Sequence, residues 1–341
     1  MRRALTRFGP AALGVAVVVA VFGFALPRIA SYRDVVEVVS ALSWWEVAAL
    51  LAATAWNIFT FAPPWRAAMP GLGLWRALVV TQASTAAAST FPGGEAVGLG
   101  LTFGMLNAWG FRRTAIVAAA AVVSALNLLA KVLIPVAALA GLVVTGREGG
   151  LLPILTLIGV AAVSLVLGAG IAALRTDAST RAFGDRLDGW RQRLPLVRRR
   201  AGSGPLGERL SHFRSESIGL LRRRWLQLTV WTLLGHTAVF VVLLVALRAV
   251  GVTGDEVSVV EAFAAWALTR LLTAIPITPG GLGIVELGLT GALVAAGGSN
   301  DEVVAAVLLY RLLTWLPSIL LGAPAALLWR RLHPGVTTPA G

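Results

Sequence analysis

Long uncharged runs alternate along the chain with short segments rich in arginine. Runs 10–27, 114–145 and 303–329 come close to or exceed the roughly 20 apolar residues that a helix needs to cross a hydrocarbon core of about 30 Å. This pattern predicts an all-α polytopic membrane protein, with a single membrane domain over residues 1–341. Further crossings are predicted at 47–62, 151–174 and 225–250.

Two pairs of shorter apolar runs are each interrupted by a Pro-Gly-Gly sequence. These runs are too short to cross the membrane, and non-helical backbone at membrane depth is tolerated only where it is buried in protein or lines a cavity. Each pair therefore predicts a re-entrant helical hairpin that turns back at the break. The pairs are 77–91 with 96–108 and 259–275 with 284–296, and the predicted hairpin tips contain Pro92, Gly93, Gly94, Pro276, Pro279, Gly280, Gly281 and Gly283.

The two breaks belong to an internal repeat. Pro92 and Pro279 are 187 positions apart (279 − 92), and the same offset places Gly110 on Gly297. The charged borders put the first hairpin on the cytoplasmic side and the second on the outer side. We therefore expect inverted structural repeats, an arrangement found in secondary transporters whose broken helices meet at the binding site. The first half is predicted to span 44–174 and the second 225–332.

Charge is scarce and mostly basic. Charged residues make up 13% of the chain, against about a quarter in soluble domains, and the formal net charge is +13. The basic residues cluster between apolar runs, a placement that the positive-inside rule explains without any nucleic acid. The rule puts both termini in the cytoplasm and the protein in the cytoplasmic (plasma) membrane. With no cysteine and three scattered histidines, the chain is expected to hold neither a metal nor a cofactor.

Residues 175–224 form the one long hydrophilic stretch. Within it Phe183, Leu187, Trp190 and Leu194 recur at helical spacing, while the arginines fall largely off that stripe. This pattern predicts an amphipathic helix that lies on anionic headgroups and anchors the loop to the cytoplasmic face. Membrane lipids are therefore the expected partners, and the sequence is also compatible with a homo-oligomer.

The second break carries the most specific motif, Pro276 to Glu286. Its glycines allow tight turns and close approach of a ligand, and the start of the next half-helix exposes amides suited to a phosphate. Thr278 adds a hydroxyl at the tip. Glu286 lies in the first turn of the half-helix, where a carboxylate complements the helix dipole. The alternative is structural, with the glycines serving helix packing and Glu286 serving as a cap.

Ionisable side chains within the apolar runs are candidates for function, because burying a charge there costs about 2.5 kcal/mol or more. Arg270 and Arg311 are placed to reach a lipid phosphate, which arginine's planar fork binds well. The alternative is that they pair with Glu286 or Glu95 and hold the bundle together. The predicted substrate-binding residues are Arg270, Arg311, Lys131, Glu286, Glu95 and Thr278, whereas His236 is expected to be structural and Asn57 and Asn127 to form interhelical hydrogen bonds.

At these residues the sequence resembles the lysylphosphatidylglycerol synthase transmembrane (flippase-like) family, from about Trp44 to Trp329. The likeness is carried by the motif Pro276 to Glu286, by Phe91 to Glu95 and by Trp109-Gly110-Phe111. The resemblance implies a many-helix membrane domain that moves lipids, or sugars on polyprenyl-phosphate carriers, between leaflets. It leaves no room for the soluble aminoacyl-transferase domain of bifunctional relatives. We therefore expect a stand-alone membrane domain without synthase activity.

Three functions are open at this point. The favoured one is a flippase or transporter, not an enzyme, that moves a phospholipid or polyprenyl-phosphate-linked lipid between leaflets. A membrane polyprenyl-diphosphate phosphatase is the enzyme alternative, because such proteins also use inverted repeats with re-entrant hairpins. The second tip lacks a Ser-Arg cluster, however, and Glu286 has no second acid three or four residues away. The third function is a non-transporting cell-envelope scaffold, which only the basic loop favours.

Overall fold

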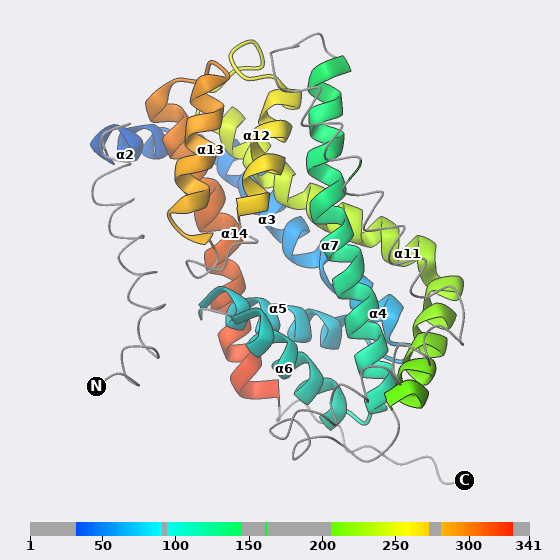
Figure 1. The fold of residues 1–341 in the computed structure, drawn as a ribbon. Helices are drawn as coiled ribbons and strands as arrows, with labels where there is room; N and C mark the ends of the chain where they lie inside the picture. The colour runs from blue at the N-terminus through cyan, green and yellow to red at the C-terminus, as the bar shows by residue number, and fades with distance from the viewer. Residues whose placement is uncertain (1–31, 91–93, 145–160, 162–205, 273–280, 330–341) are drawn as a thin grey trace, which may run out of the picture.

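The computed structural model describes residues 32–90, 94–144, 161, 206–272 and 281–329. All regular secondary structure in these ranges is helical, with no strand. Figure 1 labels the helices in chain order. They are α2 (Tyr32–Ser40), α3 (Trp44–Thr60), α4 (Ala62–Ala68), α5 (Leu74–Thr90), α6 (Gly94–Ala108), α7 (Arg113–Val144), α11 (Leu206–Ala249), α12 (Val259–Leu272), α13 (Ile284–Ala295) and α14 (Asn300–Leu328).

Four stretches of helix are long and apolar enough to cross a membrane within the described ranges. They are Trp44–Ala68, Arg113–Val144, Leu210–Ala249 and Asn300–Leu327, which confirms the predicted all-α, multi-helix class. Several predictions fall outside the described residues and stay predictions. These are the crossings at 10–27 and, apart from residue 161, 151–174, the amphipathic stretch 183–194, and the tip residues Pro92, Gly93, Pro276, Thr278, Pro279 and Gly280.

Two of the predicted crossings lie within longer stretches of helix. The crossing predicted at 47–62 is followed by Pro63 and Pro64, which are both buried within α4, and the candidate span continues to Ala68. Proline is tolerated there because the first helical positions lack an intrahelical partner for their N–H groups. The crossing expected to begin at Trp225 belongs to a helix that starts at Leu206. Side chains from that extension pack against buried residues of α4 to α7, which keeps the segment helical.

Each of the two pairs of shorter helices packs onto a long helix from a distant part of the chain. Helix α5 packs against α6 and along α14, while α12 packs against α13 and along α7. In Figure 1 the α12–α13 pair lies at the upper end of the molecule and the α5–α6 pair at the lower end. Helix α7 runs upward from the lower end, whereas α14 runs downward. Helices α5 to α7 and helices α12 to α14 therefore pack against each other at two places, α5 on α14 and α12 on α7.

Helix ends follow the sequence offset of 187. Helices α6 and α13 end at positions that this offset relates, and α7 and α14 begin at such positions. The connecting turns match as well. Gly110 and Gly297 adopt positive φ values of 84° and 121°, and their N–H groups donate to the carbonyls of Asn107 and Val294. A residue with a side chain rarely adopts these φ values, which accounts for glycine at both positions.

The first pair of helices is held together by close backbone approach. Gly94 opens α6 and is buried, as expected for a residue at the break. A methyl group placed on Gly94 or Gly98 would collide with backbone atoms of α5, at 2.5 Å from the Ser84 carbonyl oxygen in the case of Gly98. Small residues four positions apart allow membrane helices to pack at this distance.

Candidate functional site

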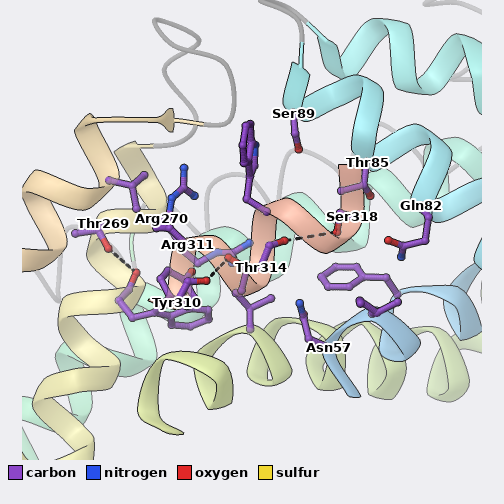
Figure 2. Close-up of a pocket in the computed structure, with 16 residues that line it drawn as sticks. Asn57, Gln82, Thr85, Ser89, Thr269, Arg270, Tyr310, Arg311, Thr314 and Ser318 are labelled. Carbon is purple, nitrogen blue, oxygen red and sulfur yellow. Dashed lines mark hydrogen bonds between the residues drawn. The ribbon is translucent and has the colours of Figure 1, made fainter. Parts of the chain in front are cut away.

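A polar cavity of about 220 Å³ lies where α3, α5, α11, α12, α13 and α14 meet. Figure 2 shows its walls. Polar side chains come from four of these helices, although each helix is apolar overall. The polar lining residues are Asn57, Gln82, Thr85, Ser89, Thr269, Arg270, Tyr310, Arg311, Thr314, Trp315 and Ser318.

Two helices present their polar residues at the same spacing. On both α5 and α14 three polar residues recur at i, i+3 and i+7, which places them on one helix face. Because α5 packs along α14, these faces border the same cavity. The residues are Gln82, Thr85 and Ser89 on α5, and Arg311, Thr314 and Ser318 on α14.

Arg311 forms the most buried ion pair in the described structure. Its Nε donates to Oε1 of Glu286 across 2.6 Å, and the two side chains are 14% and 0% exposed. The other carboxylate oxygen, Oε2, accepts the N–H of Gly283 across 2.7 Å. Glu286 therefore caps α13 and offsets the charge of Arg311. Both roles belong to the alternative in which these residues are structural.

Arg270 lies on the same cavity wall as Arg311. Its guanidinium carbon is 5.1 Å from the ring centroid of Trp266, a cation–π distance. The indole N–H of Trp266 in turn donates to the Tyr310 hydroxyl across 3.2 Å. In Figure 2 Arg270, Arg311 and Tyr310 lie toward one end of the cavity, and Gln82 and Thr85 toward the other.

Lys131 and Glu95 form a separate pair that does not line this cavity. The Lys131 ammonium nitrogen is 3.9 Å from a Glu95 carboxylate oxygen, and the side chains are 34% and 87% exposed. The predicted set of substrate-binding residues is thus divided. Arg270 and Arg311 share the cavity, with Glu286 behind Arg311. His236 is buried beside Phe61, and its ring nitrogens have no hydrogen-bond partner among the described residues.

Sequence reasoning missed most of the cavity's uncharged polar residues. Asn57 was expected to hydrogen-bond to another helix, but its Oδ1 has no partner among the described residues. Gln82 Oε1 and Trp315 Nε1 on the same wall are also without a described partner. Asn127 donates to the Val123 carbonyl of its own helix rather than across helices. The matching i, i+3, i+7 polar spacing on the two helices was the available signal.

An apolar groove of about 370 Å³ adjoins the polar cavity. It lies between α2, α13 and α14, and its walls are leucine, alanine and valine side chains apart from Glu286, Arg311 and Trp315. Arg311 and Trp315 line both spaces. The polar cavity and the apolar groove therefore meet at Arg311 and Trp315.

Comparison with known families finds a match over most of the chain. The model of the family described as "Lysylphosphatidylglycerol synthase TM region" matches residues 11–322. A comparison with curated proteins finds no match.

Proposed function

The chain belongs to the lysylphosphatidylglycerol synthase transmembrane family, and from this premise we propose that it moves an anionic lipid between the leaflets of the plasma membrane. Family membership and the four candidate spans make it a multi-pass membrane protein in contact with lipid, and the family indicates a membrane function related to lipids. Leaflet transfer, and the absence of catalysis, are the proposal.

The observation that carries this proposal is the meeting of the two spaces at Arg311 and Trp315. A phospholipid needs a polar environment for its headgroup and an apolar one for its chains. A headgroup in hydrocarbon loses its hydration, and arginine side chains at that depth offer charge-assisted hydrogen bonds to its phosphate. The lipid tails lie in the groove while the headgroup occupies the cavity.

We also propose that the two halves are inverted repeats with re-entrant hairpins. Three observations support this proposal: the shared offset of helix ends, the reciprocal packing of α5 on α14 and of α12 on α7, and the opposite directions of α7 and α14. The cavity lies between the halves, where transporters built from inverted repeats bind their substrates. Rocking of one half against the other would expose the cavity to each leaflet in turn.

The inverted arrangement predicts opposite accessibility for two equivalent turns. Arg112 and Ser299 are both exposed, are related by the offset of 187, and precede α7 and α14. Because the chain has no cysteine, single cysteines can be introduced without background. A membrane-impermeant maleimide on intact cells is expected to label Ser299→Cys but to label Arg112→Cys only after permeabilisation. Labelling of both from the same side contradicts the inversion.

Arg270→Gln is expected to slow lipid transfer. The substitution keeps a polar side chain but removes the charge from the cavity, and a hydrogen bond to a charged group contributes about 1.5–3 kcal/mol, so the rate should fall about tenfold or more. Transfer is measured with a fluorescent phosphatidylglycerol in reconstituted vesicles.

Arg66→Gln, which removes an exposed arginine outside the cavity, is the matched control and should keep the wild-type rate. Arg311 is unsuited to this experiment because its removal leaves Glu286 buried without its partner. An Arg270→Gln protein with the wild-type rate would rule out headgroup binding by this arginine.

Hydrolysis of a diphosphate lipid is less well supported by the same residues. The Thr269, Thr314 and Ser318 hydroxyls each donate to a backbone carbonyl of their own helix. None of the described lining residues is a histidine, aspartate or glutamate that could serve as the general base for such a hydroxyl. We therefore favour transport over phosphatase chemistry, and no described feature favours a scaffold.

A further inference from the structure

A second, smaller polar cavity of about 90 Å³ lies where α4, α5, α7 and α11 meet. Phe61 and Thr85 line both cavities, so the two spaces share part of a wall. The offset of 187 also relates them, because it places Asn127 of the second cavity on Thr314 of the first. The polar lining residues of the second cavity are Trp65, Thr81, Ser84, Thr85, Asn127, Trp231 and Thr232.

The described wall of the second cavity has no charged side chain. None of its described lining residues is an aspartate, glutamate, histidine, lysine or arginine. It therefore offers no titratable group that could bind a proton, and no carboxylate of the kind that divalent cations in proteins prefer. Lys131 lies one turn along α7 from Asn127 but does not line the cavity, and its ammonium group is 3.9 Å from the Glu95 carboxylate.

The same wall presents oxygen atoms with free lone pairs. The hydroxyls of Thr81 and Ser84 donate to backbone carbonyls of α5, and the Asn127 amide donates to the Val123 carbonyl, so their oxygens remain to accept. Thr232 is only 5% exposed, and its hydroxyl has no partner among the described residues. Side-chain oxygens from α5, α7 and α11 thus border one small space.

This lining matches the requirements of a small monovalent cation. Hard cations bind oxygen ligands, and neutral oxygens can hold Na⁺ between membrane helices. A buried hydroxyl without a partner is costly, and an ion would satisfy the lone pairs of Thr232 together with those of its neighbours. A buried water needs about 10–15 Å³ of such space. The cavity of about 90 Å³ therefore has room for one ion and a few waters that complete its coordination.

We infer that the second cavity binds Na⁺ through the oxygens of Thr81, Ser84, Asn127 and Thr232. An ion held between α5, α7 and α11 also fixes the position of α5, which carries Thr85 into the wall of the larger cavity. Ion binding and ligand binding in the larger cavity are then energetically coupled. The expected dependence of lipid transfer on Na⁺ rests on the proposed function, whereas ion binding does not.

The first test measures thermal unfolding of the purified protein in a neutral detergent. Tryptophan fluorescence is followed in NaCl and in choline chloride at equal ionic strength, because choline is too large for the cavity. Na⁺ is expected to raise the Tm by a few degrees, in a manner that saturates with concentration, since a ligand that binds only the folded state stabilises it. Equal Tm values in the two salts at every concentration would overturn the ion site.

The variant Thr232→Val distinguishes an ion ligand from a structural hydroxyl. In choline chloride it should be at least as stable as the wild type, because it no longer buries an unpartnered hydroxyl. Its half-saturating Na⁺ concentration should rise about tenfold through the loss of one ligand. Lower stability in choline chloride with an unchanged Na⁺ response would instead indicate a hydroxyl that binds only water. Thr237→Val is the matched control and should keep the wild-type response, because Thr237 is exposed on the same helix and its hydroxyl donates to the Leu233 and Leu234 carbonyls.

The second test measures lipid transfer in reconstituted vesicles prepared with NaCl or with choline chloride. Transfer is expected to be faster with Na⁺, and Thr232→Val should need a higher Na⁺ concentration to reach the same rate. If Na⁺ binds but the wild-type transfer rate is the same in both salts, the coupling is wrong and the ion site stands. If Na⁺ binds but no lipid is transferred in either salt, the proposed transport fails and the ion site stands.

Discussion

Replacing Glu286 with alanine is expected to lower the free energy of unfolding by about 3–5 kcal/mol, the range for removing one partner of a buried ion pair. The variant leaves the Arg311 guanidinium, which is only 14% exposed, without the carboxylate that offsets its charge. It also removes the acceptor for the Gly283 N–H at the start of α13. Unfolding by SDS in mild detergent micelles, followed by tryptophan fluorescence, measures the loss.

Two further variants distinguish the cost of burying the unpaired Arg311 charge from the cost of losing the helix cap at α13. Glu302 occupies the same third position of α14 and accepts from the Ser299 hydroxyl at the surface, so Glu302→Ala should cost only about 1 kcal/mol. The double variant Glu286→Ala/Arg311→Leu should be more stable than Glu286→Ala alone, because the Arg311 charge is then no longer buried without the Glu286 carboxylate. A double variant as unstable as the single one would show that the cap, and not the ion pair, dominates.

The second large effect is expected at Gly322, where α14 crosses α5. A methyl group built on Gly322 collides with the Gln82 carbonyl oxygen and lies 2.6 Å from the Ala86 side chain, so Gly322→Ala forces the two helices apart. Overpacking of this kind costs about 1–3 kcal/mol. Because Gln82 and Thr85 line the cavity from α5, lipid transfer should fall together with stability. SDS unfolding and the vesicle transfer assay measure the two effects.

Gly291→Ala in α13 is the matched control for that prediction. Gly291 is exposed, and an added methyl group would have no atom within 4 Å. Alanine is favoured over glycine within helices by up to about 1 kcal/mol, so this variant should be as stable as the wild type or more stable. If Gly322→Ala behaved like Gly291→Ala, the close contact between α5 and α14 would not form in the membrane.

The helical class and the positions of the long helices could be predicted from the sequence. Apolar run length identified the long helices, and the offset of 187 related Gly110 to Gly297, which the structure places at positive φ in two connecting turns. Pro63 and Pro64 lie in the first turn of α4, a position with which proline is compatible, so the same residues suit a helix end or a helix start. The packing of α4 on α5 and α11 favours the helix, and local sequence does not contain that packing.

The cavity was predictable only in part. Arg270 and Arg311 were evident because charge within an apolar run is expensive. Thr85, Thr314 and Ser318 were not, since a hydroxyl in a membrane helix can bond to its own backbone, as Thr314 and Ser318 do, and then carries no signal of its surroundings. Which polar faces meet depends on α5 packing along α14, a contact between segments far apart in the sequence.

The reciprocal packing of the halves has a consequence for how the protein is made. Helix α5 is synthesised long before α14, so its polar face has no permanent partner during most of translation. Helix α7 is likewise synthesised before α12, the helix that packs along it. Segments that expose unpaired surface while a chain grows are the ones at risk of misassembly. We therefore expect the first half to depend on the insertion machinery until the second is made, and ribosome pausing between the halves to lengthen that interval.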